Sequence, residues 1–193
     1  MPSQTAEIIS VNKDFEILLK YNSRDVLVSD QYGTTLTEFK CKRNHFFSNY
    51  YSGKSQIDNH EYSIACDSKA ITLLRNDQKV GDVRIVVKDA FYRLASIQFN
   101  DERFDLIRKD LKQIFEVMDS SGKIIFTITG KLYKGKQKNL FGLIYLDEKL
   151  FHSVTLHNDV MEEKKTLQLL VTCGYCIRLF LEIDMGETDR LQR

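Results

Sequence analysis

Cys173 and Cys176 form the Cys-x-x-Cys pair that comes nearest to a catalytic motif in this chain. A redox site of this kind needs its first cysteine exposed at the start of a helix, because the reactive species is an accessible thiolate. This pair lies instead in the middle of an apolar segment, where burial would raise the pKa of both thiols. Cys41 and His45 could supply two more zinc ligands, but the combined spacing matches no recognised zinc site. We therefore expect inert core cysteines, no metal and no cofactor.

Other residue types give no recognisable catalytic arrangement. The sequence contains no His-Glu-x-x-His helix, no Gly-x-Ser-x-Gly elbow and no glycine-rich phosphate loop. The four histidines are scattered beside expected turns, which is typical of surface residues: His45, His60, His152 and His157. We predict a protein that is not an enzyme.

Local positive charge is a more promising signal for function. Lys and Arg (28) nearly balance Asp and Glu (27), so overall charge draws the chain to neither nucleic acid nor anionic lipid. The densest positive segment runs from Lys131 to Lys138, and a second runs from Lys40 to Arg43. Each basic group near an anionic membrane contributes about 1 kcal/mol, so four or more suffice for reversible recruitment. The alternative is a set of solvated loops that only keep the protein soluble.

Two further segments are weaker candidates. Arg108 and Lys109, with Lys112, form a third basic cluster that neighbouring aspartates dilute. The aromatic run Phe46–Tyr51 could stack on bases or insert at a membrane interface, although such a run is more often a buried strand or an anchored loop. The near-neutral net charge argues against nucleic acid as a partner.

The elements that must position these residues are mainly strands. Up to Leu156 the apolar residues alternate, which predicts short strands at 15–19, 26–28, 36–39, 62–64, 71–74, 83–87, 92–99, 103–107, 114–117, 124–128, 140–146 and 153–156. Many short strands at fairly even spacing favour a barrel or a sandwich. The absence of a strand–helix rhythm argues against a parallel α/β sheet.

Two of the expected hairpins share one turn sequence, Asp-x-x-Gly, at Asp30–Gly33 and Asp119–Gly122. Aspartate favours the first position of a type I turn, where its carboxylate accepts nearby backbone N–H groups. Glycine takes the left-handed conformation that returns the chain with a bulge. The segment Asn76–Gly81 is expected to form a looser version.

The segment Leu167–Asp184 is predicted to be a helix, beginning at about residue 162, with apolar residues on all its sides. Such a helix must be buried in a core or in a membrane. Its length of 18 residues falls short of the roughly 20 that a bilayer needs, and charges such as Arg178 and Glu182 would be costly there. We expect a core helix, with Arg178 and Glu182 able to pair near an open mouth of the fold.

Paired Asp-x-x-Gly hairpins followed by a hydrophobic C-terminal helix resemble the tubby C-terminal-like superfamily, which includes LURP-one-related proteins, phospholipid scramblases and small bacterial tubby-like proteins. The resemblance extends over about residues 8–185, as a pattern without a family-specific motif. It implies a mainly β fold, a closed antiparallel β-barrel of about twelve strands around the buried helix. The Cys-Gly-Tyr-Cys sequence, Arg178 and the polar tail depart from the family pattern.

The expected organisation is one domain. We predict a flexible N-terminus at 1–7, a barrel domain at 8–186 with its central helix at about 162–184, and a polar tail at 187–193. Four cysteines without a visible signal peptide favour reduced thiols and a cytoplasmic location.

In tubby-like proteins, basic residues on the barrel surface bind phosphoinositide head groups. The resemblance makes seven residues candidates for this role: Lys40, Lys42, Arg43, Lys131, Lys134, Lys136 and Lys138. We expect a non-enzymatic binding or adaptor module, peripheral to a membrane through anionic lipids bound by basic loops. Two alternatives stay open, a protein-interaction or structural module and a lipocalin-like carrier of an apolar ligand. The carrier would need an internal cavity, which a helix inside the barrel would fill.

Overall fold

The computed structural model describes residues 15–20, 25–44, 48–54, 61–66, 71–87, 92–99, 101–110, 112–138, 144–157 and 163–184. Within these ranges, the structure does not describe the side chains of some residues, namely 20, 41–44, 48–54, 62, 66, 131–138, 144–151, 163–164 and 182. The strands, with their bounds, are β1 Phe15–Lys20, β2 Val26–Asp30, β3 Thr35–Asn44, β4 Ser48–Lys54, β5 Glu61–Cys66, β6 Ile71–Arg75, β7 Gln78–Val87, β8 Arg93–Phe99, β9 Glu102–Arg108, β10 Ile114–Asp119, β11 Ile124–Lys138 and β12 Ile144–Leu156. A single helix follows them in the described part of the chain, α1 Glu163–Asp184.

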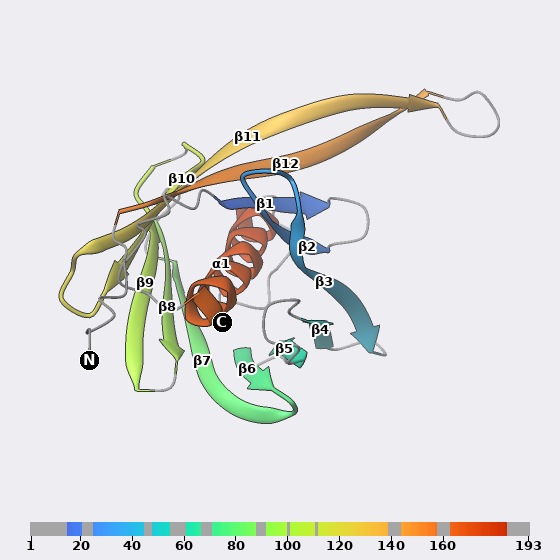
Figure 1. The fold of residues 1–193 in the computed structure, drawn as a ribbon. Coiled ribbons are helices and arrows are strands. Elements are labelled where there is room, and N and C mark those ends of the chain that lie inside the picture. The colour runs from blue at the N-terminus through green and yellow to red at the C-terminus, as the bar shows by residue number, and fades with distance from the viewer. Residues whose placement is uncertain are drawn as a thin grey trace, which may run out of the picture.

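The strands form a closed antiparallel barrel around α1 (Figure 1). Each strand pairs with its neighbours in the sequence, and β1 closes the ring by pairing with β12, with Phe15 opposite Val154. This confirms the expected mainly β fold, a closed barrel with one C-terminal helix. Closure leaves no unpaired sheet edge around the ring.

Because neighbouring strands are antiparallel throughout, all odd-numbered strands run in the same direction. The barrel therefore has two distinct ends. One, which we call the turn end, carries the two Asp-x-x-Gly turns. The other, which we call the Asp184 end, is where β9 and α1 both finish.

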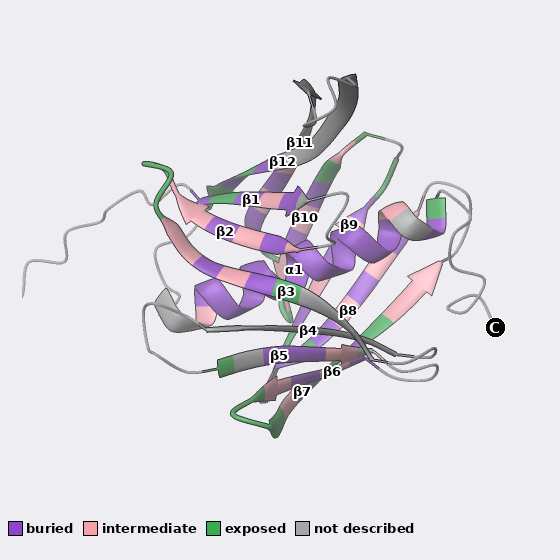
Figure 2. Cartoon of the chain, turned by 90° about the vertical axis from the view of Figure 1, so that its right-hand side faces the viewer, coloured by how far each residue is buried: buried purple, intermediate pink, exposed green. Residues whose placement is uncertain are grey.

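The barrel interior is filled by side chains of the strands and of α1. Alternate strand residues point inward and are buried, as at Phe15, Ile17 and Leu19 of β1. Every residue of α1 from 166 to 180 is buried, so all sides of the helix contact the core (Figure 2). Phe180 of α1 stacks on Phe115 of β10, with ring centroids 6.3 Å apart. The prediction of a core helix from its all-round apolar surface is confirmed.

Gly174 allows α1 to approach the barrel wall closely. A Cβ atom at this position would lie 2.8 Å from Val26 Cγ1 and 3.0 Å from Ile17 Cγ2, closer than carbon atoms can pack. The helix therefore rests directly on β1 and β2 at this point, and a larger residue would push them apart.

The two Asp-x-x-Gly turns have the same geometry, as predicted. Asp30 Oδ1 accepts the backbone N–H groups of Tyr32 and Thr34, and Gly33 has φ of 79°. In the second turn Asp119 Oδ1 accepts those of Ser121 and Lys123, and Gly122 has φ of 82°. Each turn places a bulge in the strand before it, between Val28 and Ser29 and between Val117 and Met118.

The segment at Asn76 does not form the looser turn that we expected. Asn76 and Asp77 are the two central residues of a tight hairpin, with φ of 49° and 63°. Positive φ at both positions is typical of a type I′ turn, which asparagine and aspartate tolerate.

Several strand assignments differ from the sequence prediction. β3 and β7 are longer than the predicted strands 36–39 and 83–87. β4 was not among the predicted strands, although a buried strand was one interpretation of the aromatic run 46–51. β12 is one strand, not two separate strands at 140–146 and 153–156. β11 continues to Lys138, and its pairing with β12 runs without interruption from Phe126↔Leu156 to Lys138↔Ile144. The backbone pairing between β11 and β12 stabilises these polar segments as strands, where apolar alternation alone gives no signal.

The predicted terminal segments 1–7 and 187–193 lie outside the described residues. The described strands form one closed barrel, and α1 covers the segment where a helix was predicted at about 162–184; the predicted domain bounds 8–186 stay a prediction.

Candidate functional site

The seven basic residues predicted to bind lipid lie on two strands. Lys40, Lys42 and Arg43 belong to β3, and Lys131, Lys134, Lys136 and Lys138 belong to β11. The prediction that they lie in loops is therefore wrong. Lys40 is exposed, with its Nζ 3.9 Å from a carboxylate oxygen of Glu38, while the side chains of the other six are outside the description.

Strand direction brings both basic segments to the same end of the barrel. β3 and β11 are both odd-numbered, and the basic residues occupy the C-terminal half of each strand. Both halves therefore run toward the Asp184 end, separated around the ring by β12, β1 and β2. Figure 1 shows the ends of β11 and β12 that lie next to their connection extending from the barrel. We call this two-stranded extension, residues 131–138 of β11 and 144–148 of β12, the β11–β12 arm.

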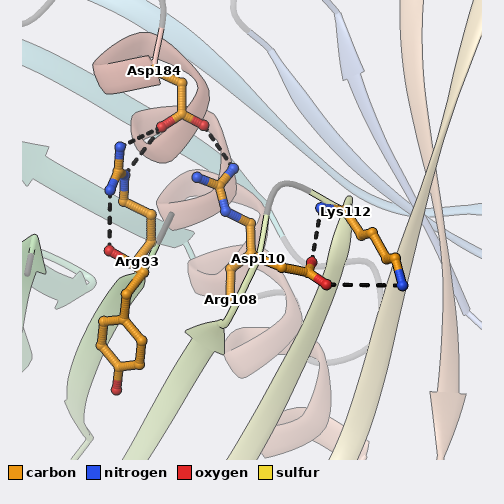
Figure 3. A network of polar contacts seen from close by, with 6 residues as sticks. Arg93, Arg108, Asp110, Lys112 and Asp184 are labelled. Carbon is orange, nitrogen blue, oxygen red and sulfur yellow. Dashed lines mark hydrogen bonds and ion pairs between the residues drawn. The ribbon is translucent and has the colours of Figure 1, made fainter. Parts of the chain in front are cut away.

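A cluster of charges with two buried arginines lies at this same end of the barrel. Arg93 Nη2 is 2.7 Å from Asp184 Oδ1, and Arg108 Nη1 is 2.6 Å from Asp184 Oδ2. The two guanidinium groups approach the carboxylate from opposite sides (Figure 3). We refer to Arg93, Arg108 and Asp184 as the Asp184 cluster.

The ends of three elements position this cluster. Arg93 is the first residue of β8 and Arg108 the last of β9, and the two are direct partners across the ladder. Like charges at directly opposite positions repel each other unless a counter-charge lies between them. Asp184, the last residue of α1, supplies that charge and ties the end of the helix to the barrel wall.

Arg93 has its hydrogen-bonding groups occupied. Its Nε and Nη2 donate to Asp184 Oδ1 at 3.1 and 2.7 Å, and its Nη1 donates to the carbonyl oxygen of Tyr92 at 3.0 Å. Arg93 thus uses one carboxylate oxygen fully, and only the other oxygen is left for Arg108.

Arg108 is the unusual member of the cluster. It is 1% exposed, and its Nη1 donates to Asp184 Oδ2, yet its Nε and Nη2 have no hydrogen-bond partner. Among the residues of the cluster two positive charges face one negative charge. The carbonyl groups at the end of α1 offset this excess only in part, since a helix terminus carries about half an elementary charge.

The exposed charges next to the cluster are paired with each other. Lys109 Nζ lies 2.8 Å from Glu116 Oε2, and this hydrogen bond, with the glutamate charge, raises the pKa of Lys109. The backbone N–H of Lys112 donates to Asp110 Oδ1 at 2.8 Å (Figure 3). The third basic cluster of the sequence therefore has two parts: Lys109 and Lys112 form ion pairs on the surface, and Arg108 is buried.

Sequence reasoning did not predict the Asp184 cluster. Arg108 was assigned to a diluted surface cluster, and Asp184 only to a helix end. A usable signal was present, because Arg108 continues the inward alternation of Phe104 and Leu106, and Arg93 precedes that of Ala95 and Ile97. The predicted pair of Arg178 and Glu182 stays a prediction, since the Glu182 side chain is outside the description.

The prediction of surface histidines is wrong for His152. This residue is fully buried on the inward face of β12, with its ring centroid 6.0 Å from that of Phe115. His157 is exposed, and its Nε2 lies 2.7 Å from Thr127 Oγ1. His45 and His60 lie outside the described residues.

Cys173 and Cys176 are buried inside the barrel and are not joined by a disulfide. Burial raises the pKa of the Cys173 thiol, which agrees with an inert core cysteine. The Cys41 side chain and His45, the other proposed zinc ligands, are outside the description. Within the described ranges no three potential metal-ligating side chains come together.

The described helix, α1, is not long and apolar enough to cross a membrane. Comparison of the chain with models of protein families, with curated proteins and with solved structures gave no match. The site must therefore be interpreted from its own chemistry.

Proposed function

We propose that this protein is a non-enzymatic binding module that attaches to anionic phospholipid head groups through the basic halves of β3 and β11. The observation that carries the proposal is strand direction, since both basic segments run toward the Asp184 end of the barrel. Basic groups on one end can face a membrane together, whereas groups on opposite ends cannot.

The number of basic groups fits weak, reversible attachment. Seven candidates at about 1 kcal/mol each near an anionic surface exceed the four that recruitment needs, even if several face away from the lipid. The formal net charge of +1 adds little to this attraction. Binding should therefore weaken strongly as salt is raised, because screening shortens the range of these charges.

The packed interior favours binding on the outside of the barrel over the carrier alternative. Residues of α1 and of the strands form one continuous buried cluster, so the space that a lipocalin-like protein offers its ligand is occupied by the helix. We do not propose a carrier.

The architecture also supports the tubby-like resemblance as a proposal. A closed barrel around a C-terminal helix is the fold which that resemblance implied. On this basis we propose a tubby-like protein with phosphoinositides as preferred lipids, located in the cytoplasm and peripheral to a membrane.

Liposome flotation with charge-reversal variants tests the proposal. The test variant carries Lys134→Glu, Lys136→Glu and Lys138→Glu at the Asp184 end. The control variant carries Lys79→Glu, Arg103→Glu and Lys123→Glu, three exposed residues that lie within one residue of the starts of β7, β9 and β11 and therefore at the turn end. Both variants lower the net charge of the protein by the same amount, and they differ in the end of the barrel at which the substitutions lie.

We expect the wild type and the control variant to float with vesicles that contain phosphoinositide, and the test variant to remain in solution. Thermal unfolding of all three proteins checks that each is folded. Equal flotation of both variants would remove the β11 lysines from the site, and no flotation of the wild type would reject the lipid proposal.

A protein-interaction module is the second candidate, and the β11–β12 arm favours it. In the described ladders, β11 beyond Gly130 pairs only with β12, and β12 before Lys149 pairs only with β11. Unpaired strand edges can bind an extended peptide by adding a strand. Failure of flotation together with capture of a partner by the arm would favour this function.

A further inference from the structure

We infer that Arg108 forms an oxyanion-binding site at the Asp184 end, with a phosphate group as its ligand. The phosphate could be inorganic phosphate or the phosphomonoester of a head group, since both present the same oxygens. The inference comes from the Asp184 cluster alone and does not depend on the proposed membrane attachment.

The unoccupied atoms of Arg108 have the geometry that oxyanions require. Nε and Nη2 form one edge of the planar guanidinium group, and both lack a partner while Nη1 is bound to Asp184. Their two N–H bonds point the same way, so together they can donate to two oxygens of one phosphate or carboxylate group. An intact bidentate edge is therefore free on this side chain.

Burial makes an empty edge costly. Arg108 is 1% exposed, so water does not solvate its unpaired N–H groups as it would on the surface. Asp184 cannot satisfy them, because Oδ2 already accepts from Nη1 and Oδ1 accepts twice from Arg93. A second anion beside Arg108 would pair both donors and neutralise the excess positive charge.

The surroundings of Arg108 favour phosphate over a carboxylate as the ligand. The Asp184 side chain is 24% exposed while that of Arg108 is 1% exposed, so the cluster lies at the boundary between the core and solvent, and an anion must displace the atoms that cover Arg108. A carboxylate would use both of its oxygens on Arg108, whereas a phosphate keeps further oxygens, and Lys109 and Lys112 follow Arg108 closely in the sequence. These lysines are exposed, and their surface pairs with Glu116 and Asp110 are weak enough to exchange.

Thermal unfolding of the full chain in phosphate, compared with chloride at equal ionic strength, tests the inference. At a phosphate concentration tenfold above Kd, binding to the folded state should raise the wild-type Tm by about 3–5 °C. Arg108→Met should abolish this rise. Arg103→Met removes an exposed arginine of the same strand and should keep it in full.

A second measurement covers the case that Arg108→Met does not fold. In wild-type protein labelled with ¹⁵N-arginine, phosphate should shift the buried Arg108 Nε–H resonance and leave that of Arg103 in place. A purely structural Arg108 would stabilise the helix end equally in phosphate and chloride. Equal Tm values in the two salts together with an unmoved Arg108 resonance would overturn the inference. The same result is expected if a carboxylate of the chain itself binds Nε and Nη2 of Arg108.

Vesicles containing phosphatidic acid separate the two sources of phosphate. If inorganic phosphate shifts Arg108 but vesicles neither bind nor shift it, the site takes a free phosphate group and the membrane proposal fails alone. If vesicles bind the wild type and Arg108→Met equally and phosphate has no effect, the membrane proposal stands and the Arg108 site is rejected.

Discussion

At the scale of single residues, two aspartates determine how the basic strands begin. Asp30 and Asp119 each accept two backbone N–H groups of their own turn, and the chain then enters β3 or β11. Asp119 also accepts a hydrogen bond from the Ser121 hydroxyl at 2.6 Å. That bond, with the backbone bond from Lys123, lowers the pKa of Asp119 below its ordinary value of 3.8.

The lowered pKa predicts a pH-dependent contribution to stability. A carboxyl group whose folded-state pKa lies below its unfolded value stabilises the fold above the unfolded pKa, and this contribution is lost as pH falls through the folded pKa. Asp119→Ala should therefore lower the free energy of unfolding at pH 7, and its difference from the wild type should shrink below about pH 3.8. Urea unfolding at pH 7, 5 and 3 measures this difference. A difference that stays constant over this range would contradict the role of the ionised carboxylate.

The contrast between Asp119 and Arg108 explains what the sequence could predict at this scale. The partners of Asp119 lie two and four residues away, so a short motif contains the whole interaction. Arg108 and Asp184 are 76 residues apart in the sequence, and only closure of the barrel around α1 brings them together. Alternation could place Arg108 inside, but no local pattern could name its partner.

At the scale of elements, the contact between α1 and the barrel wall is closest at Gly174. The missing side chain leaves room for Val26 of β2 and Ile17 of β1 against the helix. A glycine inside a helix costs about 1 kcal/mol relative to alanine, so the close packing must compensate for that cost.

Gly174→Ala tests this packing. Overpacking costs about 1–3 kcal/mol, and better helix propensity returns about 1 kcal/mol, so we expect a net loss of up to about 2 kcal/mol in the free energy of unfolding. In a Val26→Ala background the same substitution should cost less, because the nearest contact is gone and only that with Ile17 remains. Urea unfolding of the four proteins gives the coupling between the two sites. An additive result would show that the helix does not rest on β2 at this position.

Strands were predictable where one face is buried, as in β1, β8 and β9. β4 and the polar half of β11 were not predicted, because their sequences lack the alternation of apolar residues, and their backbone ladders with β3, β5 and β12 could not be known from the sequence. In β12 the charged run Asp147–Lys149 interrupted the apolar alternation, and two strands were predicted where there is one. The basic residues of β11 were assigned to a loop for the same reason.

At the scale of the whole molecule, closure around α1 gives the two ends of the barrel different chemistry. The helix finishes at the end toward which β3, β9 and β11 run, so the Asp184 cluster and the basic strand segments share that end. The strand pattern alone could not distinguish a barrel from a sandwich, since both bury alternate residues. The all-round apolar helix was the stronger signal, because it had to be enclosed.

Enclosure of α1 is the central claim, and native-state hydrogen exchange tests it most directly. Backbone amides of Leu170–Phe180 should exchange only through global unfolding, with the same free energy and urea dependence as the core amides of β8 and β9. Exchange of these helix amides at a clearly lower free energy, while β8 and β9 stay protected, would contradict a helix held inside the closed barrel.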